Sequence, residues 1–174
     1  DKRFVDIINN DLANTIGNLL NRTSSMSRKW FENKVPNNEK ISSENKLENL
    51  ANNAVEKYKD KFENYKLEQA ANEVLNLAIN TNLYLNENQP WILIKDNNNL
   101  PLVKEIIYNV LESTRIIGLL LLPLLPVLSS KINKQLGSLY QKEISWEEQL
   151  KWGLLTSNAT LPIPTPIINK LEYE

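Results

Sequence analysis

Apolar residues recur every three or four positions along the beginning of the chain, which is the spacing of an amphipathic helix. The residues on the apolar side are Val5, Ile8, Leu12, Ile16, Leu19, Thr23, Met26 and Trp30. The residues on the opposite, polar side are Asp11, Asn14, Asn18, Arg22, Ser25 and Lys29. We therefore expect a first helix over about residues 3–31, which the sequence Val-Pro-Asn-Asn at 35–38 ends.

The same spacing predicts four further long helices in the rest of the chain. They are expected at about residues 43–65, 67–85, 100–122 and 125–136. The break around 64–66 is weak, so the second helix bends there or stops. Asn99 is placed to cap the fourth helix, with Pro101 in its first turn, and Pro123 interrupts that helix. Gly137 is placed to cap the end of the fifth helix.

Three shorter stretches complete the pattern. The sequence Ile-Leu-Ile-Lys at 92–95 fits either a strand or another turn of helix. Ser145 and Glu148 have the spacing of a capping box, which predicts a short helix to about Trp152. The tail, with its prolines at 162, 164 and 166, is expected to be irregular.

Successive helices with short connections predict an all-α fold. We expect a helical bundle of about five main helices, with a short extra helix and an irregular Pro-rich tail. A chain of 174 residues with 41% apolar residues suits a single domain over residues 1–174 with a sizeable core. The 4 glycines, and the scarcity of Val and Thr beside Leu, Asn, Glu and Lys, also favour helices over sheet.

The residue types that are missing restrict the chemistry of this chain. It has no Cys and no His, which excludes a disulfide framework, a thiolate zinc site and any nucleophile that needs a histidine base. No Asp/Glu cluster has the spacing of a calcium loop, so we expect no metal site. An enzyme made of this chain alone would have to work through carboxylates, Lys or Tyr, and no motif favours such an enzyme.

The charge and the apolar runs bear on possible partners. The net charge is −1, whereas a protein that holds nucleic acid by phosphate neutralisation alone is usually basic. Any nucleic-acid contact must therefore depend on local readout. The most apolar run, at residues 116–128, is too short to span a membrane and contains two prolines, so we expect a buried core helix.

Two polar residues and one aromatic residue are candidates for recognition. Asn18 and Arg22 are four residues apart, so they lie one turn apart on the same helix face. An amide beside a guanidinium presents several donors and an acceptor to a planar partner. Spacing alone nevertheless favours a solvated face for this pair and a loop-covered core position for Trp91. The other tryptophans, Trp30, Trp146 and Trp152, are expected to pack.

Several motifs occur in a recognisable order along the chain. The first is Asn-Leu-Leu-Asn-Arg at 18–22, and the second is Asn-Leu-Tyr-Leu at 82–85 followed by Pro-Trp at 90–91. Then come a Leu-rich run with Pro-x-x-Pro at 119–126, Ser-Ser-Lys-Ile at 129–132, Leu-Gly at 136–137 and Trp-Gly-Leu-Leu at 152–155. This ordered set resembles the anticodon-binding domain of methionyl-tRNA synthetases. The tail departs from the family, because Ile-Asn-Lys-Leu-Glu at 168–172 stands where the family usually has Phe-Pro-Arg-Ile-Glu.

The resemblance implies a site and partners. Asn18, Arg22 and Trp91 would recognise the CAU anticodon of tRNA(Met), chiefly its first base, cytosine. Asn14, Asn21 and Lys29 would be weaker candidates for secondary RNA contacts. The expected partners are the tRNA(Met) anticodon loop and the catalytic domain of the synthetase; neither a membrane nor DNA is expected, and the location is cytoplasmic.

The resemblance also implies that this chain is a C-terminal part of a longer synthetase and has no catalytic residues. The sequence Ser-Met-Ser-Arg-Lys at 25–29 loosely resembles the Lys-Met-Ser-Lys-Ser loop of this enzyme class. It lies within the first helix, and the partner motif His-Ile-Gly-His cannot exist in a chain without His. No cofactor is expected here, whereas ATP with Mg would serve the catalytic domain that attaches methionine to tRNA.

Two other interpretations stay open. The chain fits the helical anticodon domain of a related synthetase for isoleucine, valine, leucine or cysteine, and it also fits a helical protein-interaction module. The Asn18/Arg22 pair together with Trp91 is what favours methionine. This interpretation requires the three side chains to converge on one exposed pocket.

Overall fold

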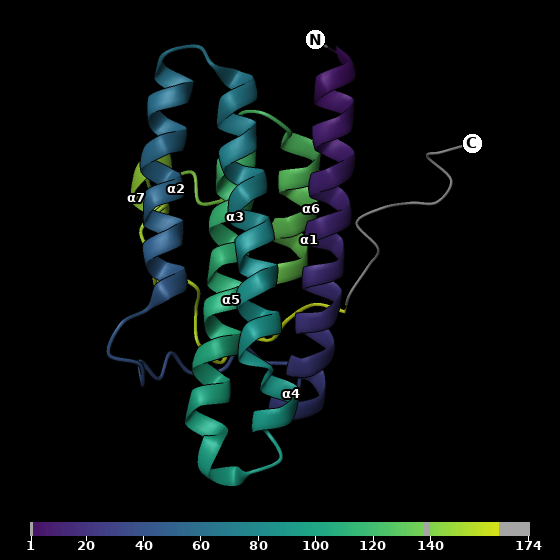
Figure 1. Cartoon of the computed structure of the whole chain (residues 1–174), viewed down its shortest axis with the longest axis vertical. Helices are drawn as coiled ribbons and strands as arrows, with labels where there is room; N and C mark the ends of the chain where they lie inside the picture. Colours follow the sequence, from purple (N-terminus) through teal and green to yellow (C-terminus); the bar gives the residue numbers. More distant parts are fainter. Residues whose placement is uncertain (1, 138–139, 164–174) are drawn as a thin grey trace, which may run out of the picture.

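Long helices form wherever the apolar spacing predicts them. The computed structural model describes residues 2–137 and 140–163, except for the side chain of residue 5. The long helices are α1 (Lys2–Phe31), α2 (Lys46–Glu63), α3 (Leu67–Asn88), α5 (Leu100–Leu121) and α6 (Pro126–Leu136). The short ones are α4 (Pro90–Leu93), the 3-10 turn η1 (Asn97–Asn99) and α7 (Trp146–Gln149). Figure 1 shows the bundle, and the all-α prediction is confirmed.

Helix α5 is the centre of the bundle, and it is buried nearly all round. Its residues from Glu105 to Leu121 are all buried, and it packs against α1, α2, α3, α4 and α6. A helix that is covered on every side belongs to the core, and its buried polar groups then need partners, as Glu112 and Arg115 have in each other. The apolar run predicted as a buried core helix over 116–128 is core only as far as Leu121, because residues 122–125 form the turn into α6 and Val127 is 69% exposed. Across the described residues, no helix has the length and apolar character that crossing a membrane requires.

The turn between α2 and α3 is a true stop. Tyr65 adopts a left-handed backbone with φ 59°, and the Lys66 amide donates to the Lys61 carbonyl at 2.8 Å. The two helices therefore form an antiparallel hairpin. Helix α2 begins slightly later than expected, because the Asn45 side chain caps it by accepting from the Glu48 amide at 3.0 Å.

Other predicted helix ends agree in part. Gly137 ends α6 with φ 64°, and Ser145 caps α7 by accepting from the Glu148 amide at 3.2 Å, as predicted. The stretch 92–95 is not a strand, because α4 covers its first two residues as a helical turn. Asn99 is the N-cap residue of α5 with Pro101 in the first turn, as predicted, but its side chain makes no capping hydrogen bond. Asp96 caps the preceding turn η1 by accepting from the Asn98 amide at 3.0 Å.

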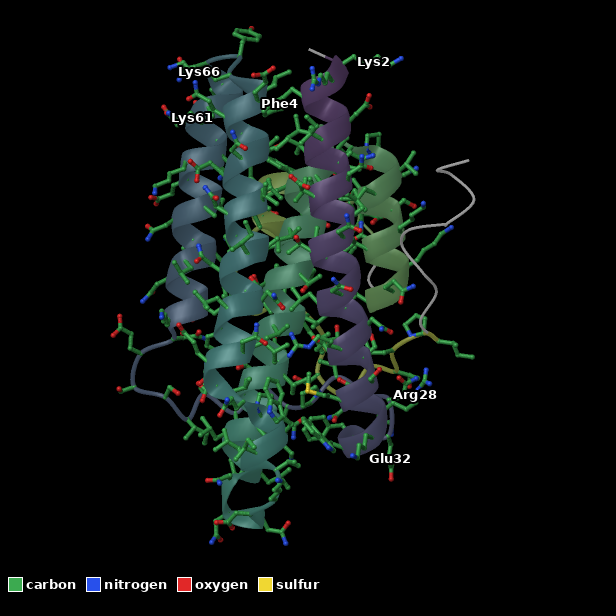
Figure 2. All side chains as sticks on the ribbon, turned by 45° about the vertical axis from the view of Figure 1, so that its right-hand side comes forward. Lys2, Phe4, Arg28, Glu32, Lys61 and Lys66 are labelled. Carbon is green, nitrogen blue, oxygen red and sulfur yellow. The ribbon has the colours of Figure 1, made fainter. Side chains whose placement is uncertain are left out.

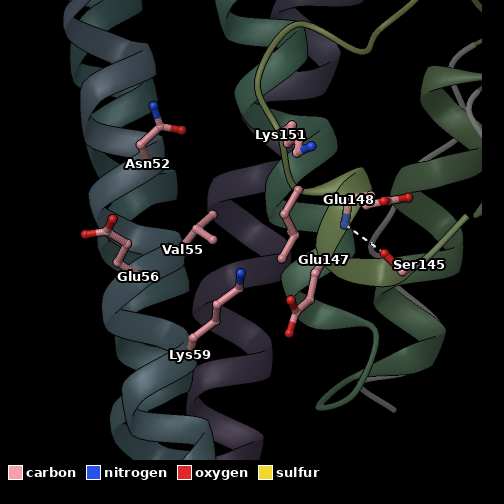
Figure 3. Close-up of a pocket in the computed structure, with 9 residues that line it drawn as sticks. Asn52, Val55, Glu56, Lys59, Ser145, Glu147, Glu148 and Lys151 are labelled. Atoms are coloured by element: carbon pink, nitrogen blue, oxygen red, sulfur yellow. Dashed lines mark hydrogen bonds between the residues drawn. The ribbon is translucent and has the colours of Figure 1, made fainter.

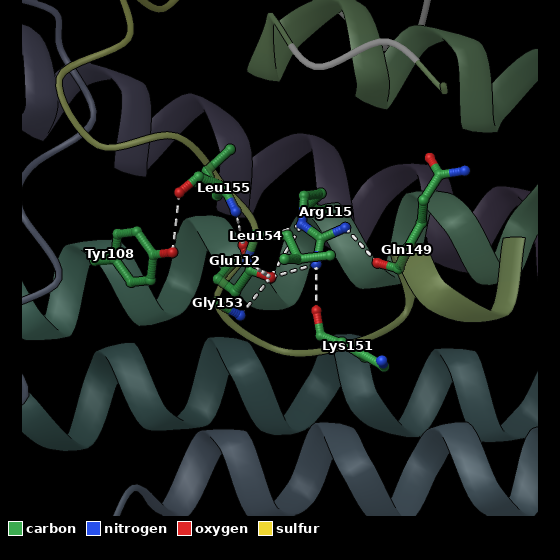
Figure 4. A network of polar contacts seen from close by, with 8 residues as sticks. All are labelled: Tyr108, Glu112, Arg115, Gln149, Lys151, Gly153, Leu154 and Leu155. Atoms are coloured by element: carbon green, nitrogen blue, oxygen red, sulfur yellow. Dashed lines mark hydrogen bonds and ion pairs between the residues drawn. The ribbon is translucent and has the colours of Figure 1, made fainter. Parts of the chain in front are cut away.

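The chain between 149 and 161, which we call the C-terminal segment, is fastened at two places. Helix α7 ends at Gln149, earlier than the predicted end at Trp152. The reason is that the Arg115 guanidinium donates hydrogen bonds to the carbonyls of Gln149 and Lys151 at 2.6 and 2.8 Å (Figure 4). Further on, the backbone of residues 158–161 pairs with the backbone of residues 33–35, which follows α1. Residues 162 and 163 have no regular structure, and the rest of the predicted irregular tail, including 168–172, lies outside the described residues.

Candidate nucleic-acid interface

Helices α1 and α3 lie side by side and run in the same direction (Figure 1). In Figure 2, Lys2 and Phe4 at the start of α1 lie at the same end as Lys61 and Lys66 near the α2–α3 turn. Arg28 lies towards the opposite end. The second half of α1 therefore lies beside the second half of α3, and α4 follows directly after α3.

Arg22 joins these three helices. Its Nη1 donates to Asn82 Oδ1 at 3.2 Å, and its Nη2 donates to Asn86 Oδ1 at 2.9 Å. Its guanidinium carbon lies 5.4 Å from the centroid of the Trp91 ring, within the range of a cation–π contact. The planar fork of Arg suits this arrangement, because one side chain can satisfy two amides and still lie against a ring. The structure thus brings Arg22 and Trp91 together.

Trp91 is held at the end of α3 by the local backbone. Gln89 ends α3 in a left-handed conformation with φ 46°, and the buried Pro90 begins α4. Proline is favoured in the first turn of a helix, where a missing amide costs nothing. The Trp91 side chain is half-buried, since it packs on the edge of the core while part of it stays exposed. The ring is therefore neither a fully buried core residue nor a free surface group.

The remaining predicted residues lie on the exposed surface of α1. Asn18 is exposed one turn before Arg22, close enough to share one ligand with it. Asn14 and Asn21 are exposed as well. Lys29 is exposed about 10 Å further along the helix axis than Arg22, so it cannot contact the same base. The RNA contacts of Asn14, Asn21 and Lys29 stay predictions.

Asn82 and Asn86 are the site residues that sequence reasoning missed. Their spacing of four along α3 repeats the spacing of Asn18 and Arg22, which was the available signal. Both partners of Arg22 are neutral amides, and no carboxylate among the described residues pairs with it. The guanidinium is held in place while its positive charge stays uncompensated.

Tyr84 fixes the rotation of α3. It lies two residues from both Asn82 and Asn86, so it points to the opposite side of the helix. Its hydroxyl accepts from Asn109 Nδ2 at 3.1 Å, and Asn109 Oδ1 accepts from Asn45 Nδ2 at 3.1 Å. Burial raises the pKa of Tyr84 and so favours its neutral form. With the partly buried Tyr84 held by Asn109 of α5, the two asparagines face α1.

The other predicted tryptophans pack, as expected. Trp146 Nε1 donates to the Leu119 carbonyl at 2.7 Å, and its ring lies 6.0 Å from that of Tyr58. Trp30 meets Phe31 edge to face at 6.4 Å, and Trp152 is half-buried against the core.

A groove of about 580 Å³ lies between α2 and the region of α7 (Figure 3). Its walls carry charges of both signs, from Glu56, Lys59, Glu147 and Lys151 among others. None of Asn18, Arg22 and Trp91 lines this groove. Across the described residues, no group of three Asp or Glu side chains is placed to hold a metal ion.

Comparisons with known proteins agree on one family. The family model described as the anticodon binding domain of methionyl tRNA ligase matches residues 35–174. The methionine–tRNA ligase of Nostoc sp. is 36% identical over 181 residues, which cover 98% of this chain and 33% of that protein. The ligase of Thermosynechococcus vestitus is also 36% identical, over 179 residues that cover 98% of this chain and 34% of that protein.

Solved structures that are similar to this chain come from the same family. The crystal structure of free Mycobacterium tuberculosis methionyl-tRNA synthetase superposes with a TM-score of 0.79 at 27% identity and covers 98% of this chain. The structure of that synthetase bound by methionyl-adenylate superposes with a TM-score of 0.77 at 28% identity and covers 96% of this chain. The chain spans about one third of these relatives, between 33% and 34% of their length. Asn18 and Arg22 precede the range of the family model but lie within the aligned parts of the relatives.

Proposed function

The chain belongs to the family of anticodon-binding domains of methionyl-tRNA ligases, and from this premise we propose that Asn18, Arg22 and Trp91 form one base-reading site. The site would read the first base, cytosine, of the CAU anticodon of tRNA(Met). The observation that supports this proposal most strongly is the 5.4 Å contact between the Arg22 guanidinium and the Trp91 ring. A donor-rich group and a stacking surface are the two parts that recognition of an unpaired base requires.

The chemistry of the site suits cytosine. An unpaired base stacks on the exposed part of the Trp91 ring, and its Watson–Crick edge then faces Arg22 and Asn18. Cytosine offers O2 and N3 as acceptors and N4 as a donor. Arg22 has five N–H donors, of which Asn82 and Asn86 occupy two, so the others are available to the acceptors of the base. The Asn18 amide can accept from N4.

Uracil in place of cytosine meets the same groups with the wrong pattern. Its N3 carries a proton where cytosine has a lone pair, and O4 is an acceptor where cytosine has an amino group. Two donors or two acceptors then face each other, and a buried polar group loses its partner. One mismatch of this kind costs about 1–3 kcal/mol.

We further propose that this domain guides a longer ligase to its tRNA. In that protein a catalytic domain outside this chain would attach methionine, with ATP and Mg supplying the activation. The Mycobacterium tuberculosis relative is known with methionyl-adenylate bound, which is the activated form of the amino acid. The catalytic domain and tRNA(Met) are the partners, and the cytoplasm is the place of action, under this proposal.

The proposal is tested by binding of the 174-residue chain to an anticodon stem-loop RNA with CAU. Trp91→Ala removes the stacking surface and is expected to weaken binding about 5- to 150-fold, the equivalent of about 1–3 kcal/mol. Trp91→Phe keeps a ring and is expected to retain most of the affinity. Circular dichroism before and after heating verifies that both variants are folded.

A matched control uses Trp152→Phe, because Trp152 is also half-buried but lies in the C-terminal segment. This variant is expected to bind the CAU loop as the unaltered chain does. Asn18→Ala provides a second test that cannot depend on folding, since Asn18 is exposed, and it is expected to weaken binding as well. Folded Trp91→Ala and Asn18→Ala variants with unchanged affinity would refute the proposed site.

A further inference from the structure

Two large apolar side chains are exposed on α3 close to Arg22. Ile79 is 49% exposed and Leu83 is 48% exposed. They are four residues apart, so they form a short stripe along the helix. Contact of these two apolar side chains with water is unfavourable in the free domain, and a ligand that covers them recovers this free energy.

The stripe borders the asparagines that hold Arg22. At about 100° per residue, Asn82, Asn86, Ile79 and Leu83 fall within a sector of about 100° around the α3 axis. Leu83 lies about 4.5 Å along the axis from Asn86, and Ile79 lies about 10.5 Å from it. Leu83 is therefore an apolar neighbour of the two asparagines that hold Arg22.

The exposed face of α3 around this stripe carries no cation. Its other exposed members are Asn72, Asn76, Asn86 and Glu87, and the Glu87 carboxylate lies 3.6 Å from Lys46 Nζ of α2. Phosphate groups are bound by cations, whereas bases present apolar faces and hydrogen-bonding edges. An apolar stripe lined by amides thus matches a nucleobase better than a phosphate. A stable protein partner usually covers about 800 Å² on each side, far more than two side chains offer.

We propose that Leu83 and Ile79 form the apolar support for the second anticodon base. This inference rests on the proposed function, because the middle base is the next nucleotide after the one placed at Trp91. An aliphatic surface contacts the face of any base and does not read its edge. The support therefore adds affinity at the middle position without choosing the base.

A double-mutant cycle tests the inference. One partner is Leu83→Ala in the full chain, and the other is a CAU stem-loop whose second anticodon position is abasic. Leu83→Ala is expected to weaken binding to the intact loop about three- to tenfold. The same substitution is expected to leave binding to the abasic loop unchanged, because the group it contacts is already gone. Ile79→Ala is expected to behave in the same way with a smaller effect.

Ile7→Ala serves as the control. Ile7 is also 49% exposed, but it lies near the start of α1, at the other end from Arg28, and it should not alter binding to either loop. Equal weakening of the intact and abasic loops by Leu83→Ala would overturn the inference. So would a concentration-dependent dimer of the unaltered chain that Leu83→Ala dissociates, since the stripe would then join two copies.

A parallel cycle separates this inference from the proposed function. It combines Trp91→Ala with a loop that is abasic at the first anticodon position. If Trp91 is coupled to the first base but Leu83 is not coupled to the second, the support is refuted and the base-reading site stands. If Trp91 shows no coupling to the first base, the proposed function itself is wrong.

Discussion

The buried ion pair of α5 is expected to control the stability of the domain. The Glu112 side chain is fully buried, and that of Arg115 is 6% exposed. Glu112 accepts from the amides of Gly153, Leu154 and Leu155 at 3.1, 3.3 and 2.9 Å. It also pairs with the Arg115 guanidinium (Figure 4). One carboxylate thus neutralises a buried cation and fastens the C-terminal segment to α5.

The expected cost of Glu112→Ala follows from these contacts. Arg115 would keep its backbone partners but lose its only carboxylate among the described residues, and an unpaired buried charge costs about 3–5 kcal/mol. The three amides would also lose their acceptor, at about 1–3 kcal/mol for each one that stays buried. These costs do not add, because the C-terminal segment can move into water. We therefore expect a loss of about 3–5 kcal/mol from a domain whose total is about 5–15 kcal/mol.

Urea unfolding followed by tryptophan fluorescence and circular dichroism measures this loss. The control is the double variant Glu112→Leu with Arg115→Met, which leaves no buried charge and is expected to cost less than Glu112→Ala alone. A loss below about 1 kcal/mol for Glu112→Ala would refute the assigned role. If the double variant costs as much as Glu112→Leu and Arg115→Met measured singly and added together, the coupling between the two side chains is refuted.

Two further predictions concern tyrosine burial and a helix end. Burial raises the pKa of Tyr58, so the unfolded state loses its proton first and the unfolding free energy falls as the pH rises above about 10. The Tyr58 hydroxyl is buried without a hydrogen-bond partner in the described structure, so Tyr58→Phe should cost less than about 1 kcal/mol of unfolding free energy at neutral pH. In urea titrations the variant should also lose less unfolding free energy at alkaline pH. An unchanged loss at alkaline pH contradicts this. Gly137→Ala should lower the unfolding free energy by about 1–2 kcal/mol, because Gly137 has φ 64° and an added Cβ would lie 3.3 Å from Pro162. Thermal melting measures this change, and an unchanged melting temperature contradicts the prediction.

The bundle could be predicted because it depends on local spacing. Helix periodicity locates the five long helices, and the apolar α5 has to be central. The sequence does not predict a definite stop at Tyr65, because it has neither Gly nor Pro there and an exposed Tyr takes the left-handed conformation instead. Local spacing does not predict the early end of α7, because Arg115, far away in the sequence, donates to the carbonyl of its last residue, Gln149.

The candidate site could be predicted only in part, because two of its residues depend on how helices far apart in the sequence pack together. Spacing placed Asn18 and Arg22 on one face, and the family resemblance added Trp91. The partners Asn82 and Asn86 depend on how far α3 is shifted along α1 and how it is rotated. That rotation is fixed by the hydrogen bond between Tyr84 and the buried Asn109 of α5, which no local pattern reveals.

The most direct test compares stem-loops that differ only in the first anticodon base. The 174-residue chain is titrated with CAU and UAU loops at one stated salt concentration, because phosphate contacts make affinity salt-dependent. We predict that CAU binds about 5- to 150-fold more tightly than UAU, as one mismatched base implies. Equal affinity for the two loops would contradict the reading of cytosine by Asn18, Arg22 and Trp91.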